Sequence, residues 1–338
     1  MSIFRNSRNR NPPEREKSDL SHSHGVIDPA LYTSQRGIWC VKWSFFGLLG
    51  TAIFQFLIVL NSGSISLFAD TVHNFGDAAT GLPLWVAFIL MWRKPSKSFT
   101  YGYGRFEDFA GAIIILTILA TALVSGYASL MRLYHPQAFS HLPAVAGASV
   151  AGFLGNEAVA QFRIKTGKEI KSAALVADGY HARIDGLTSL IVLFGVLGTW
   201  LGYPLTDPVI GLIITLIIFI ILGKLSRSIF KRMLDGVDPR VTEDIFEASK
   251  ETPGVRDVSE VRVRWLGHRL HAEVNIAVDP NLSVEAGHEI AVETRHLLLH
   301  HLKYLSNATI HVDPLSSSGE KFHAINQHVH DQLPGHSH

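Results

Sequence analysis

Long apolar stretches alternate with short polar segments over the middle of the chain, from Trp43 to Gly223. A stretch of about 20 apolar residues is long enough to cross the hydrocarbon core of a bilayer as a helix. The pattern predicts six such spans, at Trp43–Leu60, Ile65–Trp92, Phe109–Met131, Leu142–Phe162, Ser172–Leu201 and Pro208–Gly223. The second and fifth spans are long, which indicates tilt or polar extensions at their ends.

Beyond Arg232 the spacing of apolar residues changes to that of a small domain with helices and strands. The pattern predicts the order α-β-β-α-β, at Thr242–Thr252, Val258–Trp265, Leu270–Val278, Val284–Leu305 and Ala308–Val312. A domain of about 80 residues is only marginally stable alone, so we expect it to pair with a second copy.

The expected fold class is therefore an all-α six-helix transmembrane bundle followed by a cytosolic α+β domain of αββαβ order, which is metallochaperone-like. We expect residues 39–232 to form the six-helix transmembrane domain and residues 233–315 the α+β domain. Residues 1–38 are charged and contain Pro12-Pro13, so we expect a disordered cytosolic segment. Residues 316–338 form a polar tail that contains histidines.

Basic residues predict the orientation in the membrane. Arginines and lysines precede the first span, follow the sixth, and fill the connections between spans two and three and between spans four and five. The latter connection holds Arg163, Lys165, Lys168 and Lys171, whereas the three opposite connections hold only Arg132. This asymmetry predicts a multi-pass protein with both termini in the cytoplasm, with the plasma membrane as the default location.

Composition narrows the function further. The net charge of +1 gives no reason to expect nucleic-acid binding. Cys40 is the only cysteine, so no disulfide within the chain and no thiolate cluster is expected. The polar N-terminus predicts no cleavable signal peptide.

The pattern Ala-Asp-x-x-His-x-x-x-Asp occurs twice, at residues 69–77 and 177–185, each time inside an apolar span. A His and an Asp four residues apart share one face of a helix. Because the second and fifth spans are antiparallel, His73 lies level with Asp185 and Asp77 with His181. Two imidazoles and two carboxylates form a tetrahedral ligand set suited to Zn²⁺.

Ionisable groups within a membrane usually mark an ion path. A histidine must lose its proton to bind metal, so metal and protons compete at such a site and a proton gradient can drive export. The alternative is that these side chains only form hydrogen bonds between helices. Asp70 and Asp178, three residues before each histidine, are candidates to orient the imidazoles or guide cations in, against helix capping or a solvated vestibule wall. For Glu157 and Gln55 we expect hydrogen bonds between helices.

With these features in place, the chain resembles the cation diffusion facilitator family over about residues 35–315. Six segments carry the resemblance: Ser66–Asp70, Tyr101–Glu107, His181–Leu187, Asp207-Pro208, Leu234-Asp235 and Val278–Pro280. The resemblance implies a homodimeric antiporter that exports divalent metal ions from the cytoplasm in exchange for protons. His73, Asp77, His181 and Asp185 match the transport site of the family. Members with this ligand set prefer Zn²⁺, with Co²⁺ and Cd²⁺ as alternative substrates.

The resemblance also assigns residues outside the transport site. Arg105 matches a basic position that pairs with an acid, here Asp235, and joins the protomers near the membrane surface. Phe99 and Tyr103 stand where some members have metal-binding histidines, so that loop site is expected to be absent.

In the cytosolic domain, His288, His311 and Asp313 match metal-ligand positions of the family. Ser259 and Asn275 stand where other members have histidines, and His271, on the same strand face as Asn275, is a candidate substitute. The resemblance implies regulatory Zn²⁺ there; the alternative is a set of solvated polar residues.

Two other functions compete with transport. A membrane-embedded zinc metalloenzyme needs an open coordination position and a general base, and the chain has no His-Glu-x-x-His motif. A metal sensor or scaffold that binds Zn²⁺ without moving it is also compatible with the sequence. We expect a secondary transporter, not an enzyme.

Overall fold

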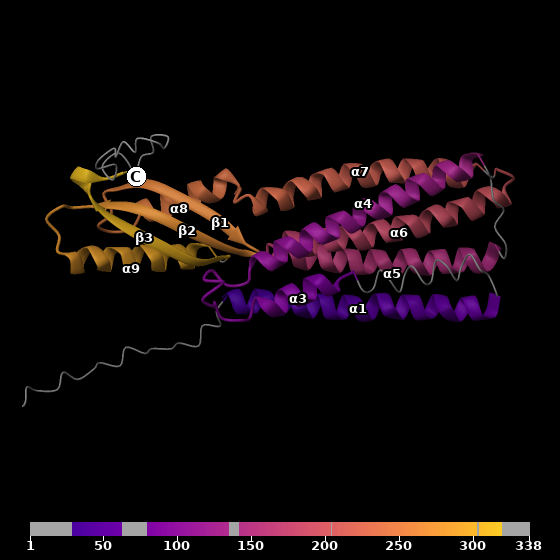
Figure 1. The fold of residues 1–338 in the computed structure, drawn as a ribbon, viewed down its shortest axis with the longest axis horizontal. Coiled ribbons are helices and arrows are strands. Elements are labelled where there is room, and N and C mark those ends of the chain that lie inside the picture. The colour runs from indigo at the N-terminus through magenta and orange to yellow at the C-terminus, as the bar shows by residue number, and fades with distance from the viewer. Residues whose placement is uncertain (1–28, 63–79, 135–141, 204, 303, 320–338) are drawn as a thin grey trace, which may run out of the picture.

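Long helices run side by side through most of the molecule, and a small domain with a sheet lies at one end of them (Figure 1). The computed structural model describes residues 29–62, 80–134, 142–203, 205–302 and 304–319. The helices of the bundle are α1 (Pro29–Ser62), α3 (Leu82–Leu90), α4 (Arg105–Tyr134), α5 (Leu142–Glu169), α6 (Ala173–Trp200) and α7 (Thr206–Met233).

Among the described residues, four segments are long and apolar enough to cross a membrane: Thr33–Ile58, Arg105–Tyr134, Ala173–Gly198 and Thr206–Met233. They correspond to the first, third, fifth and sixth predicted spans. The fourth predicted span forms α5, which is equally long but carries Asn156, Glu157 and Arg163. Of the second predicted span, residues 65–79 lie outside the described residues, and its end forms α3.

The helix α1 begins earlier than the apolar pattern indicates. Residues 29–38, which we expected to be disordered, form the first turns of α1, so that boundary was wrong. Tertiary contacts explain the difference, because Ser34 is fully buried and an added Cβ at Gly37 would lie 2.8 Å from the ring of Phe88. Such contacts stabilise a helix beyond its apolar segment.

The C-terminal domain confirms the predicted α-β-β-α-β order. It comprises α8 (Pro239–Lys250), β1 (Asp257–Leu266), β2 (Arg269–Val278), α9 (Val284–His301), β3 (Leu305–Pro314) and a short 3₁₀ turn at Leu315–Ser317. Strand β2 lies in the centre of the sheet, antiparallel to β1 and parallel to β3, with α9 as the crossover.

The core of this domain lies on one face of the sheet. The alternation predicted in β2 is confirmed, because its apolar side chains are all buried: Leu270, Ala272, Val274, Ile276 and Val278. They pack with Ile245 of α8 and Leu298 of α9. The opposite face of β2 carries His271, Glu273 and Asn275, which leaves it polar.

Candidate metal centre

His181 and Asp185 lie on the buried face of α6. Their side chains are 1% and 3% exposed, and Nδ1 of His181 lies 3.7 Å from Oδ2 of Asp185. At the rise of an α-helix they lie about 12 and 18 Å from the start of α6, which is about 40 Å long. The other half of the predicted ligand set, His73 and Asp77, lies outside the described residues, as does Asp70.

Asp178, one turn before His181, has a buried cationic partner. Nη1 of Arg163 lies 3.0 Å from Oδ2 of Asp178, and the two side chains are 1% and 0% exposed. We had placed Arg163 in the polar connection after the fourth span, and that assignment was wrong because Arg163 lies within α5. A buried charge is stable only when it is paired, so this ion pair neutralises the carboxylate of Asp178.

Close packing of α5 on α6 brings this pair together. An added Cβ at Gly179 would lie 2.7 Å from Cγ1 and 2.9 Å from the backbone nitrogen of Ile164. Real Cβ atoms do not approach other heavy atoms so closely, so the glycine permits the helices to meet where Arg163 faces Asp178. One glycine in the second motif thus positions the residues beside His181.

Gly179→Ala is therefore expected to lower the thermal midpoint of the purified protein, since overpacking a close helix contact costs about 1–3 kcal/mol. Gly147→Ala is the matched control, because no heavy atom lies within 4 Å of an added Cβ there. That control should be neutral or slightly stabilising, as alanine favours helix. Tryptophan fluorescence during heating in detergent measures both, and equal midpoints for the two variants would contradict the packing argument.

A second ion pair joins the same two helices on a more open face. Nη2 and Nε of Arg183 donate to the two carboxylate oxygens of Glu157, over 2.7 and 3.0 Å. The expectation that Glu157 bonds between helices is confirmed, and Arg183 is directed to α5. Gln55 also does so, donating from α1 to the carbonyl of Ala148 over 3.1 Å.

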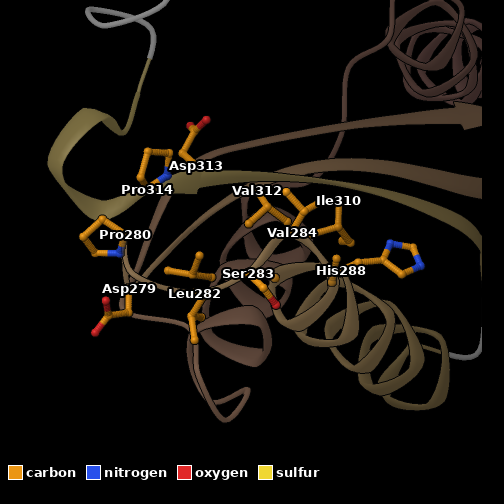
Figure 2. Close-up of a pocket in the computed structure, with 13 residues that line it drawn as sticks. Asp279, Pro280, Leu282, Ser283, Val284, His288, Ile310, Val312, Asp313 and Pro314 are labelled. Atoms are coloured by element: carbon orange, nitrogen blue, oxygen red, sulfur yellow. The ribbon is translucent and has the colours of Figure 1, made fainter.

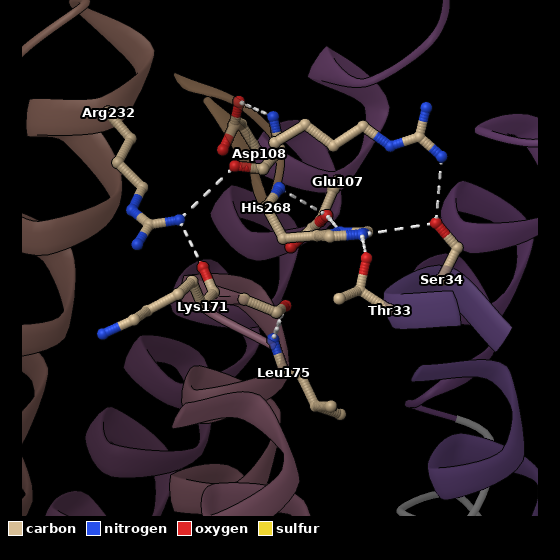
Figure 3. Close-up of polar contacts among 11 residues, drawn as sticks. Thr33, Ser34, Glu107, Asp108, Lys171, Leu175, Arg232 and His268 are labelled. Carbon is tan, nitrogen blue, oxygen red and sulfur yellow. Dashed lines mark hydrogen bonds and ion pairs between the residues drawn. The ribbon is translucent and has the colours of Figure 1, made fainter. Parts of the chain in front are cut away.

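A buried histidine connects the bundle to the C-terminal domain (Figure 3). Nδ1 of His268, in the turn between β1 and β2, lies 2.6 Å from Oε2 of Glu107 at the start of α4. Nε2 of the same ring lies 3.1 Å from Oγ1 of Thr33 and 3.2 Å from Oγ of Ser34 in α1. This contact ties three segments that are distant in the sequence.

Neighbouring groups extend the junction around His268. The amide of Gly267 donates to Asp108 over 3.2 Å, and the guanidinium of Arg232 lies 4.3 Å from the ring centroid of Trp265. The sequence pattern places residues 266–269 between two predicted strands and gives no indication of this role. Glu107 lies in the Tyr101–Glu107 segment, which was the only available signal.

Arg105 and Asp235 form an ion pair within one chain. Arg105 also donates to the backbone carbonyl of Arg232 over 2.9 Å. The pair therefore holds the start of α4 to the end of α7. Its predicted role between protomers stays a prediction.

The predicted cytosolic ligands are only partly brought together. Nε2 of His311 lies 2.9 Å from Oδ1 of Asp313, with the histidine half-exposed and the carboxylate buried. His288 and Asp313 line the same cavity of about 370 Å³, but Figure 2 shows the ring of His288 directed away from Asp313. Within the part of the chain that the structure describes, no three His, Cys, Asp or Glu side chains converge on one point.

His271 lies apart from these three residues. In the sheet register His311 is opposite Asn275, whereas His271 is opposite Asn307, four residues along β2 and so about 13 Å away. Its side chain lines a different cavity, beside Tyr101 and Tyr103. The structure does not support His271 as the substitute ligand.

Comparisons with known proteins agree with this arrangement. A family model described as the cation efflux transmembrane domain matches residues 41–234, and one described as the cytoplasmic domain of cation efflux proteins matches residues 237–315. The chain is 46% identical to the probable cation efflux system protein Rv2025c of Mycobacterium tuberculosis, over 87% of this chain and 89% of the relative. It is 26% identical to the uncharacterized transporter MJ0449 of Methanocaldococcus jannaschii, over 74% and 88%. It is 27% identical to the manganese efflux system protein MneP of Bacillus subtilis, over 80% and 89%.

Proposed function

Because this chain belongs to the cation diffusion facilitator family of cation efflux transporters, we propose that it is a homodimeric antiporter that exports Zn²⁺ from the cytoplasm in exchange for protons. The resemblance noted from the sequence is thereby confirmed at the level of the family, and family membership favours a transporter over an enzyme. The observation that carries the proposal is the buried His181–Asp185 pair, one turn apart on a helix that is able to cross a membrane.

In this proposal His73 and Asp77 complete the ligand set from the second span. Two nitrogen and two oxygen ligands suit Zn²⁺, whereas harder ions favour oxygen-rich sites. Co²⁺ and Cd²⁺ are the expected alternatives. Mn²⁺ belongs in the same comparison, since a relative with 27% identity is named a manganese efflux system protein.

Charge balance over the four proposed ligands favours the exchange of two protons for each metal ion. Asp77 and Asp185 supply two negative charges to this set, and the ion pair with Arg163 neutralises the neighbouring Asp178. With one Zn²⁺ bound and both histidines neutral, the two carboxylates and the metal ion have no net charge. Without metal, the two carboxylates and two protonated histidines also have no net charge. Either state is then tolerable within the membrane, and alternating access carries each across in turn.

The C-terminal domain has a regulatory role in this proposal. A metal ion binds at His311 and Asp313, with His288 as a third ligand after its side chain turns across the cavity. The His268 contact transmits movement of that domain to α1 and α4. Arg105 and Asp235 lie near the dimer axis at the cytoplasmic surface of the plasma membrane, with both termini in the cytoplasm.

Zinc flux into proteoliposomes that contain the purified full chain tests the antiport. An opposing proton gradient is expected to accelerate uptake of Zn²⁺, reported by a fluorescent indicator, and a protonophore should remove that acceleration. Parallel assays with Co²⁺, Cd²⁺ and Mn²⁺ rank the substrates. A rate of metal flux that does not change with the proton gradient would rule out proton coupling. Metal binding without any flux would favour a sensor or scaffold.

A further inference from the structure

A second cavity, of about 200 Å³, lies where the bundle meets the C-terminal domain. Its walls come from the segment after α3 and from the sheet, and its polar lining side chains are Arg93, Tyr101, Tyr103, Arg269, His271 and Ser306. It is distinct from the buried face of α6 and from the cavity beside His288. The function proposed above makes no use of it.

The charge of this cavity is positive. Arg93 and Arg269 line it from the two domains, and Nη2 of Arg269 also donates to Oγ of Ser34 over 3.2 Å. None of the described residues that line the cavity is acidic. Arg264 lies just outside, 4.4 Å from the ring centroid of Tyr101, and its Nη2 pairs with Oε1 of Glu273 over 3.0 Å. Burial lowers the pKa of His271, and the charges of Arg264 and Arg269 lower it further against the opposing effect of Glu273. With two arginines in its lining and no acidic side chain among the described lining residues, the cavity favours an anion over a cation.

The segment of residues 95–104, whose two ends line the cavity, is ordered by its own contacts. The backbones of Ser96 and Phe99 exchange two hydrogen bonds, of 3.1 and 3.2 Å, and the hydroxyl of Tyr103 donates to Oγ of Ser96 over 3.3 Å. Gly104 packs so closely on the sheet that an added Cβ would lie 2.6 Å from the carbonyl oxygen of Leu266. A preformed cavity loses little entropy when it binds a ligand.

Exposed aromatic side chains lie beside the cavity. Arg93 directly follows Trp92 near the end of α3, and the side chains of Trp92 and Tyr101 are 47% and 60% exposed. Exposed Trp and Tyr mark the membrane–water interface, where basic side chains meet the phosphates of anionic lipids. A guanidinium also binds phosphate oxygens in pairs.

We propose that this cavity binds a phosphate group, supplied by an anionic phospholipid headgroup or by free phosphate, which bridges Arg93 of the bundle to Arg269 and His271 of the C-terminal domain. A bound phosphate links the two domains beside the His268 contact. Binding therefore stabilises the docked arrangement of the domains by RT ln(1 + L/Kd), where L is the concentration of free phosphate ligand.

Thermal unfolding of the purified full chain tests this site with two probes. The first is inorganic phosphate in lipid-free detergent, and the second is nanodiscs of phosphatidylcholine with and without phosphatidylglycerol. At least one probe is expected to raise the thermal midpoint of the wild-type chain. Stabilisation by phosphatidylglycerol alone identifies a lipid headgroup, and stabilisation by inorganic phosphate alone identifies free phosphate.

Arg93→Gln combined with His271→Gln is expected to weaken the apparent affinity for the effective probe about tenfold or more, the equivalent of about 1.4 kcal/mol. Lys97→Gln with His300→Gln is the matched control, since both residues are exposed and neither lines the cavity. Arg93→Lys keeps the positive charge but loses the pair of hydrogen bonds from the guanidinium to phosphate, so it should weaken binding less than the double variant. It replaces the double variant in this test if that protein fails to fold. Wild-type protein that responds to neither probe, or a wild-type response in the double variant and in Arg93→Lys, would overturn the proposal.

Discussion

Replacing His181 with alanine is expected to reduce proton-driven Zn²⁺ flux in proteoliposomes by more than about tenfold, because the tetrahedral site that we propose would lose one of its two nitrogen ligands. The residue is 1% exposed on a membrane-crossing helix, so water cannot take its place easily. The removal of the imidazole also removes one of the groups on which metal and protons compete in the proposed exchange. The measurement is initial Zn²⁺ uptake at a fixed proton gradient.

His300→Ala is the matched control for this experiment, since that histidine is exposed on α9 and far along the chain from the motif. Its flux should equal that of the wild type. Asp185→Asn keeps the size of the side chain and removes a negative ligand, so it should reduce flux as well. Correctly folded His181→Ala protein with undiminished flux would show that the proposed site does not carry the ion.

Arg163→Met is expected to destabilise the bundle strongly, because it leaves the carboxylate of Asp178 buried without its cation. Breaking a buried ion pair on one side costs about 3–5 kcal/mol. Adding Asp178→Asn to the same chain removes the stranded charge, so the double variant should recover most of the loss. Thermal midpoints of the three proteins in one detergent measure this coupling.

The Arg183–Glu157 pair supplies a control between the same two helices. Its side chains are 31% and 25% exposed, so solvent screens the charges, and Arg183→Met should cost much less than Arg163→Met. If Asp178→Asn fails to rescue Arg163→Met, or if the two arginine variants are equally stable, the buried pair is not the stabilising unit that we describe.

Local sequence patterns were sufficient to predict many of the helices and strands. The alternation of Leu270 to Val278 predicted a strand with one buried face, and the apolar runs predicted most of the bundle helices. Spacing alone also predicted that His181 and Asp185 share a face, since the repeat of an α-helix is a local property. Helix ends were less accurate, as α1 begins at Pro29 and α7 extends to Met233, past the predicted Gly223.

The pairing of charges across the fold was not predictable in this way. Arg163 looked like a loop residue because lysines follow it, and its partner Asp178 looked like a neighbour of the metal site. His268 falls between two predicted strands, and nothing in the local pattern indicates its contact with Glu107, 161 positions away in the chain. The physical reason is the separation along the sequence of the residues that interact. Periodicity depends on whether each residue faces water or a nearby residue of the same helix or strand. Ion pairs instead form between segments that only the packing of helices and sheet brings together.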